Sequence, residues 1–177
     1  PLSLLSSPIS TLNSLMTKYE SQIYTINTPV ELAYARMADL RHFEKIKLAL
    51  SNPQALEMMA AQMHAGQIKP EQLEQARQQI EKMEFTADTL SADSQMGPIT
   101  LGIVEREEQK LVKLETQNAP MSATLWVQFL PKGTDQTAIK VTVGAELNFF
   151  IRKMVEKHLK KAPDGIAAFL SNVLAVG

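Results

Sequence analysis

The stretch from residue 136 to residue 173, QTAIKVTVGAELNFFIRKMVEKHLKKAPDGIAAFLSNV, contains the two patterns that decide the fold. Its first part alternates, with an apolar face made of Ile139, Val141, Val143 and Ala145. Lys140, Thr142 and Glu146 share the other face, which is typical of a strand with one solvated side. Asn148 can then cap a long helix with an apolar stripe at Ile151, Val155, Leu159, Ala162, Ile166, Phe169 and Val173. We expect this helix to cover the sheet.

Upstream of this stretch the period is also two, and turn residues separate short apolar runs. We predict strands at Lys82–Thr86, Leu90–Ser94, Ile99–Glu107, Leu111–Gln117, Ser122–Leu130 and Gln136–Ala145. The links between them are too short for parallel crossovers, so neighbouring strands must be antiparallel. Pro163 lies inside the predicted last helix and removes a backbone donor, so a kink or break is expected there.

The first half of the chain predicts a strand followed by helices. Residues Lys18–Asn27 alternate like a strand, and Thr28, Pro29 and Glu31 form a helix start with N-cap, proline and capping-box carboxylate. Asp39 can cap a second short helix. Pro53–Ala65 and Pro70–Met83 then predict an antiparallel helical hairpin.

The predicted fold class is therefore α+β, with a curved seven-stranded antiparallel sheet around a long C-terminal helix. We expect residues 1–16 to be an N-terminal tail, and residues 17–177 a single domain in which 53–83 is an inserted helical hairpin.

Composition limits the classes of function. The formal net charge is −1, from 18 basic and 19 acidic residues, so no overall field favours nucleic acid. Without cysteine the chain has no disulfide, thiolate metal site or cysteine nucleophile, and a reducing, cytoplasmic location is the simplest expectation. No apolar run is long enough for a transmembrane segment.

Several segments carry a family resemblance: Tyr19-Glu20-Ser21 leading to Thr28-Pro29-Val30-Glu31, then Ile103-Val104-Glu105-Arg106-Glu107, and Thr124-Leu125-Trp126-Val127. With the order of elements, they resemble the helix-grip fold of START-related (SRPBCC) proteins, the superfamily of birch pollen allergen and polyketide cyclases, and in particular its small bacterial members. The resemblance covers Lys18 to about Leu174. Two features differ from the family. The glycine-rich loop of the plant members is absent, so we do not expect phosphate binding there. The hairpin at 53–83 is longer than the usual link between the second helix and the sheet.

The resemblance implies a cavity between sheet and last helix that holds a lipid, quinone or polyketide-like molecule. The residues expected to line it are Ile103, Leu114, Leu125, Val127, Ile139, Val141, Val143, Met154, His158 and Phe169. A filled core explains the same alternation equally well, because protein interiors are densely packed.

Little in the sequence indicates chemistry. His158 is the candidate acid/base residue or ligand anchor, although a solvated histidine is the commoner case. His42 and His64 lack carboxylates at metal-ligand spacing, and no nucleophile elbow, phosphate loop or dinucleotide fingerprint occurs. We therefore expect no catalytic residue, no metal and no cofactor.

Three functions remain open at this point. The preferred hypothesis is a non-catalytic carrier of a hydrophobic small molecule, with the hairpin as lid. The alternatives are a cyclase- or dehydratase-like enzyme using His158 with Tyr24 or Tyr34, and a co-chaperone-like protein-interaction module. No nucleic-acid partner is expected, and the basic run Arg152–Lys161 could bring the protein to a membrane surface, although a solvated helix face is the usual explanation. The oligomeric state is left open.

Overall fold

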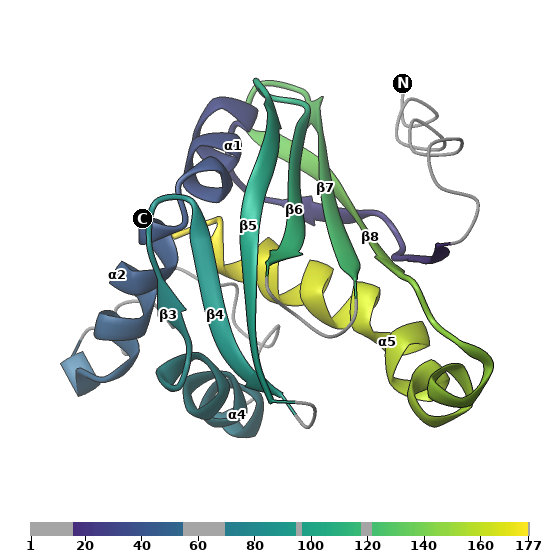
Figure 1. The fold of residues 1–177 in the computed structure, drawn as a ribbon. Helices are drawn as coiled ribbons and strands as arrows, with labels where there is room; N and C mark the ends of the chain where they lie inside the picture. Colours follow the sequence, from purple (N-terminus) through teal and green to yellow (C-terminus); the bar gives the residue numbers. More distant parts are fainter. Residues whose placement is uncertain (1–15, 55–69, 95–96, 118–121, 177) are drawn as a thin grey trace.

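The structure is a computed structural model of the chain, and it describes residues 16–54, 70–94, 97–117 and 122–176. Figure 1 shows a sheet of antiparallel strands with helices at one end and along one face. The helices are α1 (Val30–Ala38), α2 (Arg41–Leu50), α4 (Pro70–Glu81) and α5 (Phe149–Val173). The strands are β1 (Thr17–Glu20), β2 (Tyr24–Ile26), β3 (Glu84–Phe85), β4 (Thr89–Ser94), β5 (Gly97–Glu107), β6 (Leu111–Gln117), β7 (Ala123–Lys132) and β8 (Gln136–Ala145).

The sheet has the order β1-β8-β7-β6-β5-β4-β3, and every pair is antiparallel. The predicted α+β class and antiparallel meander are therefore confirmed, and the predicted bounds of β6 and β8 match those observed. Strands β3 to β8 follow one another in space as in sequence because turns of a few residues join them.

The prediction of seven strands is wrong, because the first predicted strand is divided into β1 and β2. Both pair with β8, which makes an eight-stranded sheet. From Glu20 to Tyr24 the chain advances four residues while its partner advances three, from Thr142 to Ile139. The extra residue forms an irregularity at Ser21, whose hydroxyl accepts from the Val141 amide at 2.9 Å.

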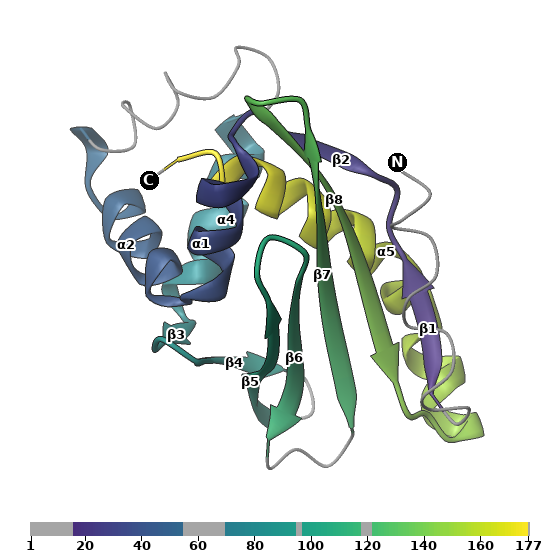
Figure 2. The ribbon, with the colours of Figure 1, turned by 90° about the horizontal axis from the view of Figure 1, so that it is seen from above.

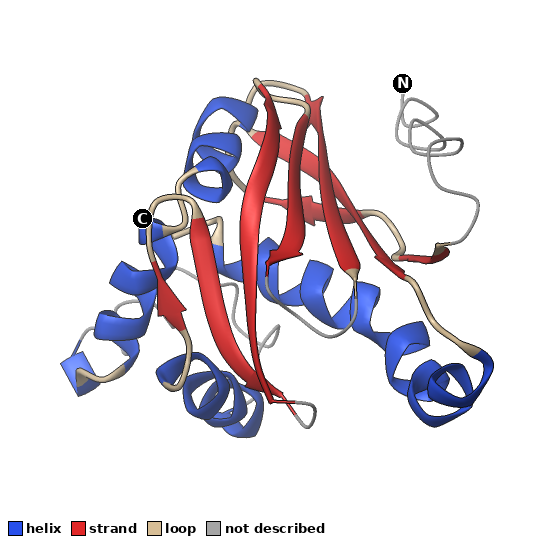
Figure 3. Cartoon of the chain, viewed as in Figure 1, coloured by secondary structure: helices blue, strands red, loops and turns tan. Residues whose placement is uncertain are grey.

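The sheet curves around α5, which runs along one of its faces (Figures 1 and 2). Helix α5 contacts β8, β1 and β2, while α1 contacts β6, β7 and β8. Figure 3 shows α5 passing behind the strands, with the other helices along the border of the sheet. Among the described helices none is long and apolar enough to cross a membrane.

The C-terminal end of α5 is fixed by side chains from the first two helices. Arg36 Nη1 of α1 donates to the Leu174 carbonyl at 2.8 Å, and His42 Nε2 of α2 lies 2.9 Å from the Val173 carbonyl. A carbonyl only accepts, so His42 donates through Nε2. These bonds satisfy carbonyls that a helix end leaves without an intrahelical partner.

Two helix-start predictions need correction. Thr28 is not the N-cap of α1, because that position is occupied by Pro29 and has no side-chain cap hydrogen bond. Thr28 is buried, and its carbonyl accepts from Thr137 Oγ1 at 2.7 Å, so it ties the start of α1 to β8 instead. The Asp39 carboxylate does accept from the Arg41 amide at 3.0 Å, although the N-cap position of α2 is Leu40.

The two predictions for the later helices have different outcomes. The second arm of the hairpin is observed as α4, while most of the first arm lies outside the described residues. Helix α5 continues through Pro163 without a break, and Pro163 is fully buried within it.

Candidate functional site

The register of the sheet shows which side chains share the face toward α5. One row across the sheet joins Ile103, Leu114, Leu125 and Val143, and ends at Tyr19 on β1. Because side chains of paired residues lie on the same side of a sheet, these residues belong to one face. Val112, Val127 and Val141 form the next row of the same face. We call this side of the sheet the concave face.

One end of the concave face is packed. Val112, Val127, Ile139 and Val141 have no exposed surface, and all four belong to the main core cluster. Phe129 closes this end, with its ring edge-on to Tyr34 of α1 at 5.6 Å between ring centroids. We call it the packed end. Of the residues predicted to line a cavity, Val127, Ile139 and Val141 therefore lie in filled core here.

The other end of the concave face is less completely covered. Ile103, Leu125 and Val143 are only half-buried, although each packs against the core cluster. Leu101 of β5 is in the same state, as are the α5 residues Ile166 and Phe169. We call this the half-buried end. Leu114 is fully buried between Ile103 and Leu125 and marks the boundary with the packed end.

A bulge in β5 lies where the two ends of the concave face meet. The register shifts between Ile103 and Glu105, so that Ile103 pairs with Leu114 and Arg106 pairs with Val112. Ile103 and Arg106 thus share the concave face although they are three residues apart. Arg106 then reaches the Ala38 carbonyl at 2.9 Å and the Asp88 carboxylate at 2.6 Å, which attaches β5 to the end of α1.

Tyr19 contributes a polar atom to the concave face. Its hydroxyl oxygen is buried, and no described residue forms a hydrogen bond with it. Tyr19 pairs with Val143 and therefore lies at the half-buried end. A buried hydroxyl without a partner is costly, which makes this oxygen a candidate for contact with a bound molecule. This property could not be predicted from the sequence, because strand alternation does not reveal which hydroxyl lacks a hydrogen-bond partner.

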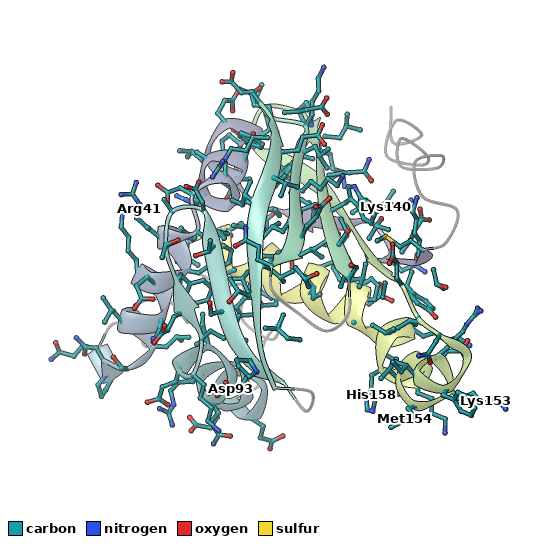
Figure 4. All side chains as sticks on the ribbon, viewed as in Figure 1. Arg41, Asp93, Lys140, Lys153, Met154 and His158 are labelled. Carbon is teal, nitrogen blue, oxygen red and sulfur yellow. The ribbon has the colours of Figure 1, made fainter. Side chains whose placement is uncertain are left out.

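Met154 and His158 do not lie where the sequence interpretation placed them. Met154 is 78% exposed, and His158 is also exposed. Figure 4 shows the two side chains beside each other on α5, with Lys153 on a different side of the helix. Both residues lie one position before Val155 and Leu159, so a helix turns them about 100° away from the sheet-facing stripe. We exclude them from the concave face for this reason.

The described residues do not assemble an acid/base pair around His158. Its exposure removes it from the interior, while Tyr34 is buried in the core. The Tyr24 hydroxyl lies 3.4 Å from the Asp164 carboxylate; burial, followed by that negative charge, raises the pKa of Tyr24. Within the described ranges no group of three or more potential metal ligands occurs. His64 lies outside these ranges.

His42 is a buried residue, in contrast to the surface position that is usual for a lone histidine. Burial lowers its pKa, and the hydrogen bond to Val173 opposes this in part. Its hydrogen bond to Val173 gives it a structural role in attaching α2 to α5, while its ring lies edge-on to that of the neighbouring Phe43 at 5.7 Å between centroids.

The outer face of the sheet carries an aromatic residue that the sequence left without a role. Trp126 pairs with Thr142 on the side opposite α5 and is 7% exposed. The ammonium groups of Lys18 and Lys113 lie 5.4 and 5.8 Å from its ring centroid, within reach of cation–π attraction. Trp126 is thus not part of the concave face.

Comparison with solved structures shows the fold. Norcoclaurine synthase from Thalictrum flavum matches with a TM-score of 0.56 at 11% identity, covering 90% of this chain and 84% of that one. A truncated form of the same enzyme matches with a TM-score of 0.55 at 10% identity, covering 95% and 98%. A START superfamily protein from Mycobacterium smegmatis has a TM-score of 0.44 at 13% identity, covering 88% and 98%.

No family model matches the sequence, and no curated protein matches it. At these identities the structural matches bear on the fold alone. The chain has the helix-grip fold, as its sequence resemblance predicted.

Proposed function

We propose that this protein is a non-catalytic binding or carrier protein for a hydrophobic small molecule, such as a lipid, quinone or polyketide-like compound. The molecule would lie at the half-buried end of the concave face, between the sheet and α5. One observation carries the proposal: Ile103, Leu125 and Val143 keep exposed apolar surface in one row of a face whose next row, Val112, Val127 and Val141, is fully buried.

The physical basis is the hydrophobic effect. Covering exposed apolar surface gains about 25 cal/mol per Å², and Ile103, Leu125 and Val143 lie in one row across neighbouring strands. A filled core alone gives no reason for the difference between the two ends. An occupant of suitable size would complete the packing that the chain's own side chains leave incomplete.

The Tyr19 hydroxyl indicates which polar group the bound molecule would have. Of the two buried, unpartnered side-chain oxygens among the described residues, Tyr19 lies on the concave face and Thr142 on the outer face. A mainly apolar molecule with one hydroxyl or carbonyl group would satisfy Tyr19 and gain selectivity from it. The proposal therefore favours a molecule with a single polar end.

The structural match supports the idea that this fold holds small organic molecules. One norcoclaurine synthase structure contains dopamine and hydroxybenzaldehyde. That match has 10% identity and a TM-score of 0.53, so it supports a binding role here by analogy of fold only. For the enzymatic alternative no described residue supplies a buried acid/base pair, and the hairpin surface required for a co-chaperone role lies largely outside the described residues.

The test uses the full chain, native mass spectrometry and a neutral fluorescent probe, N-phenylnaphthylamine. We expect a co-purified apolar compound or saturable binding of the probe at one site. The double variant Leu125→Gln/Val143→Gln should weaken probe binding at least tenfold, because two amides would be buried against the bound molecule. Leu48→Gln on α2 is the matched control, since Leu48 is 63% exposed and lies away from the concave face.

Two results would contradict the proposal. One is the absence of both a co-purified compound and saturable probe binding. The other is probe binding that Leu48→Gln weakens as much as the double variant does. Circular dichroism of each variant must first show an unchanged fold.

A further inference from the structure

We propose that the outward face of the first half of α5 docks on an anionic membrane surface. The face consists of two apolar residues among lysines. Phe150 and Met154 are 77% and 78% exposed, which makes them the most exposed large apolar side chains among the described residues. The lysines of the face are Lys153, Lys157, Lys160 and Lys161, all exposed. We call this set the cationic face of α5.

Helical geometry places these residues on one side. Phe150, Met154, Lys157 and Lys161 follow each other at spacings of four, three and four, which is the spacing of a single line along a helix. Lys153 and Lys160 flank that line on one side, roughly 70–90° round the helix from its centre, so Figure 4 shows Lys153 apart from Met154. The sheet-facing stripe of Ile151, Val155 and Leu159 is half-buried, so the cationic face points away from the sheet.

The charge of this segment is concentrated and of one sign. Between residues 149 and 162 there are five cations, Arg152 and the four lysines, against one acid, Glu156, which gives a formal net charge of +4. The whole chain has a net charge of −1, so the rest of the protein is acidic. The Glu156–Lys160 pair spans 3.6 Å and is solvent-exposed, and such pairs are weak. An anionic surface is the complementary partner.

The apolar residues distinguish a membrane from other anionic partners. An amphipathic helix lies in the membrane interface with lysines at the headgroups and phenylalanine or leucine in the acyl region. A polyanion such as nucleic acid would need the cations but would leave Phe150 and Met154 in water. A second copy of this chain would bring two +4 faces together, which like-charge repulsion opposes.

This inference does not depend on the proposed ligand. The cationic face and the half-buried end lie on different sides of α5, so either role can fail without the other. A carrier that docks through α5 would bring the half-buried end close to the surface from which an apolar molecule is collected.

The test is co-sedimentation of the full chain with vesicles of phosphatidylcholine alone and of phosphatidylcholine with about a third phosphatidylserine, near 0.1 M salt. We expect binding to the second kind only. Lys157→Gln/Lys161→Gln should weaken it about 25-fold, at about fivefold for each lysine near the surface. Lys45→Gln/Lys110→Gln is the matched control, because both lysines are exposed on other elements. It should change binding less than threefold.

The apolar part is tested by Phe150→Ala/Met154→Ala, with Leu48→Ala as the control at comparable exposure. We expect vesicle binding to fall at least fivefold in the first variant and heparin binding to stay unchanged. Four results would overturn the proposal: no binding to the anionic vesicles, equal binding to both kinds, equal loss in the lysine control, or unchanged vesicle binding after removal of Phe150 and Met154. A dimer in solution that these two alanines dissociate would assign the face to a second copy instead.

Discussion

The two ends of the layer between sheet and α5 are built from the same kinds of residue but are covered to different degrees. At the packed end, Val127 and Ile139 are fully buried in one core cluster with Leu170 of α5, with Leu174 just after that helix, and with buried residues of α1 and α2. At the half-buried end, Leu101, Ile103 and Val143 lack comparable cover. The difference indicates that α1 and α2 fix the C-terminal end of α5. They leave the half-buried end of the concave face available for a bound molecule.

The largest effect is expected from truncation at the packed end. Leu174 has no exposed surface, so Leu174→Ala should lower the free energy of unfolding by about 2–5 kcal/mol. Leu101→Ala at the half-buried end should cost less, about 1–2 kcal/mol, because part of that side chain's surface stays exposed in the folded protein. Urea unfolding of both variants measures the difference. Equal losses would mean that the two ends are packed alike.

The two ends of α5 should also differ in how strongly they are fixed. Arg36→Met removes a charged donor from the Leu174 carbonyl, and we expect a loss of about 1.5–3 kcal/mol. At the other end the Asn148 side chain accepts from the Ile151 amide at 2.9 Å, and Asn148→Ala should cost about 1 kcal/mol, as for other N-caps. Chemical denaturation gives both values. A larger loss for Asn148→Ala would reverse this ranking.

The packed end should also give the protein a dependence on pH. Burial lowers the pKa of folded His42 below the value of about 6.5 in the unfolded chain, so the unfolded state binds the proton first as pH falls. The contribution of His42 to the free energy of unfolding is therefore fully present above about pH 6.5. Below that pH it decreases, by at most about 1.4 kcal/mol per pH unit.

Thermal or urea unfolding between pH 7.5 and about pH 5 measures this effect. In His42→Gln that part of the decrease should disappear, since a glutamine amide can donate to Val173 without titrating. His158→Gln is the control, because His158 is exposed. An unchanged pH dependence in His42→Gln would show that other groups cause the decrease.

The smallest effect concerns the two buried oxygens without partners. Thr142→Val and Tyr19→Phe each remove one, and each should raise the free energy of unfolding of the ligand-free protein by about 1 kcal/mol. Thr142 lies on the outer face and serves as the reference. If Tyr19→Phe instead destabilises the protein, the Tyr19 hydroxyl is satisfied by water, and the half-buried end is wet rather than apolar.

The sequence predicted the fold from strong local patterns and missed what depends on contacts between distant segments. Alternation predicted the observed bounds of β6 and β8, because the residues that face the covered side of a sheet must be apolar. The break between β1 and β2 was missed because it depends on hydrogen bonds between Ser21 and β8. The role of Thr28 was misassigned for a similar reason, since its partner Thr137 is distant in sequence.

The candidate site was predictable in part. Register confirmed that Ile103, Leu125 and Val143 share a face with Leu114. Met154 and His158 were assigned to that face wrongly, although the spacing of the sheet-facing stripe already excludes them. Their exposure, together with that of Phe150, instead revealed the cationic face of α5.

The sequence by itself determined the order of the elements, their antiparallel pairing and the amphipathic character of α5, because period and turn chemistry are local properties of the chain. Only the tertiary structure decided which part of the concave face is filled. A strand has the same alternation of apolar residues whether its inner side chains are fully packed or only partly covered. The packed end differs from the half-buried end because α1, α2 and the end of α5 come together there.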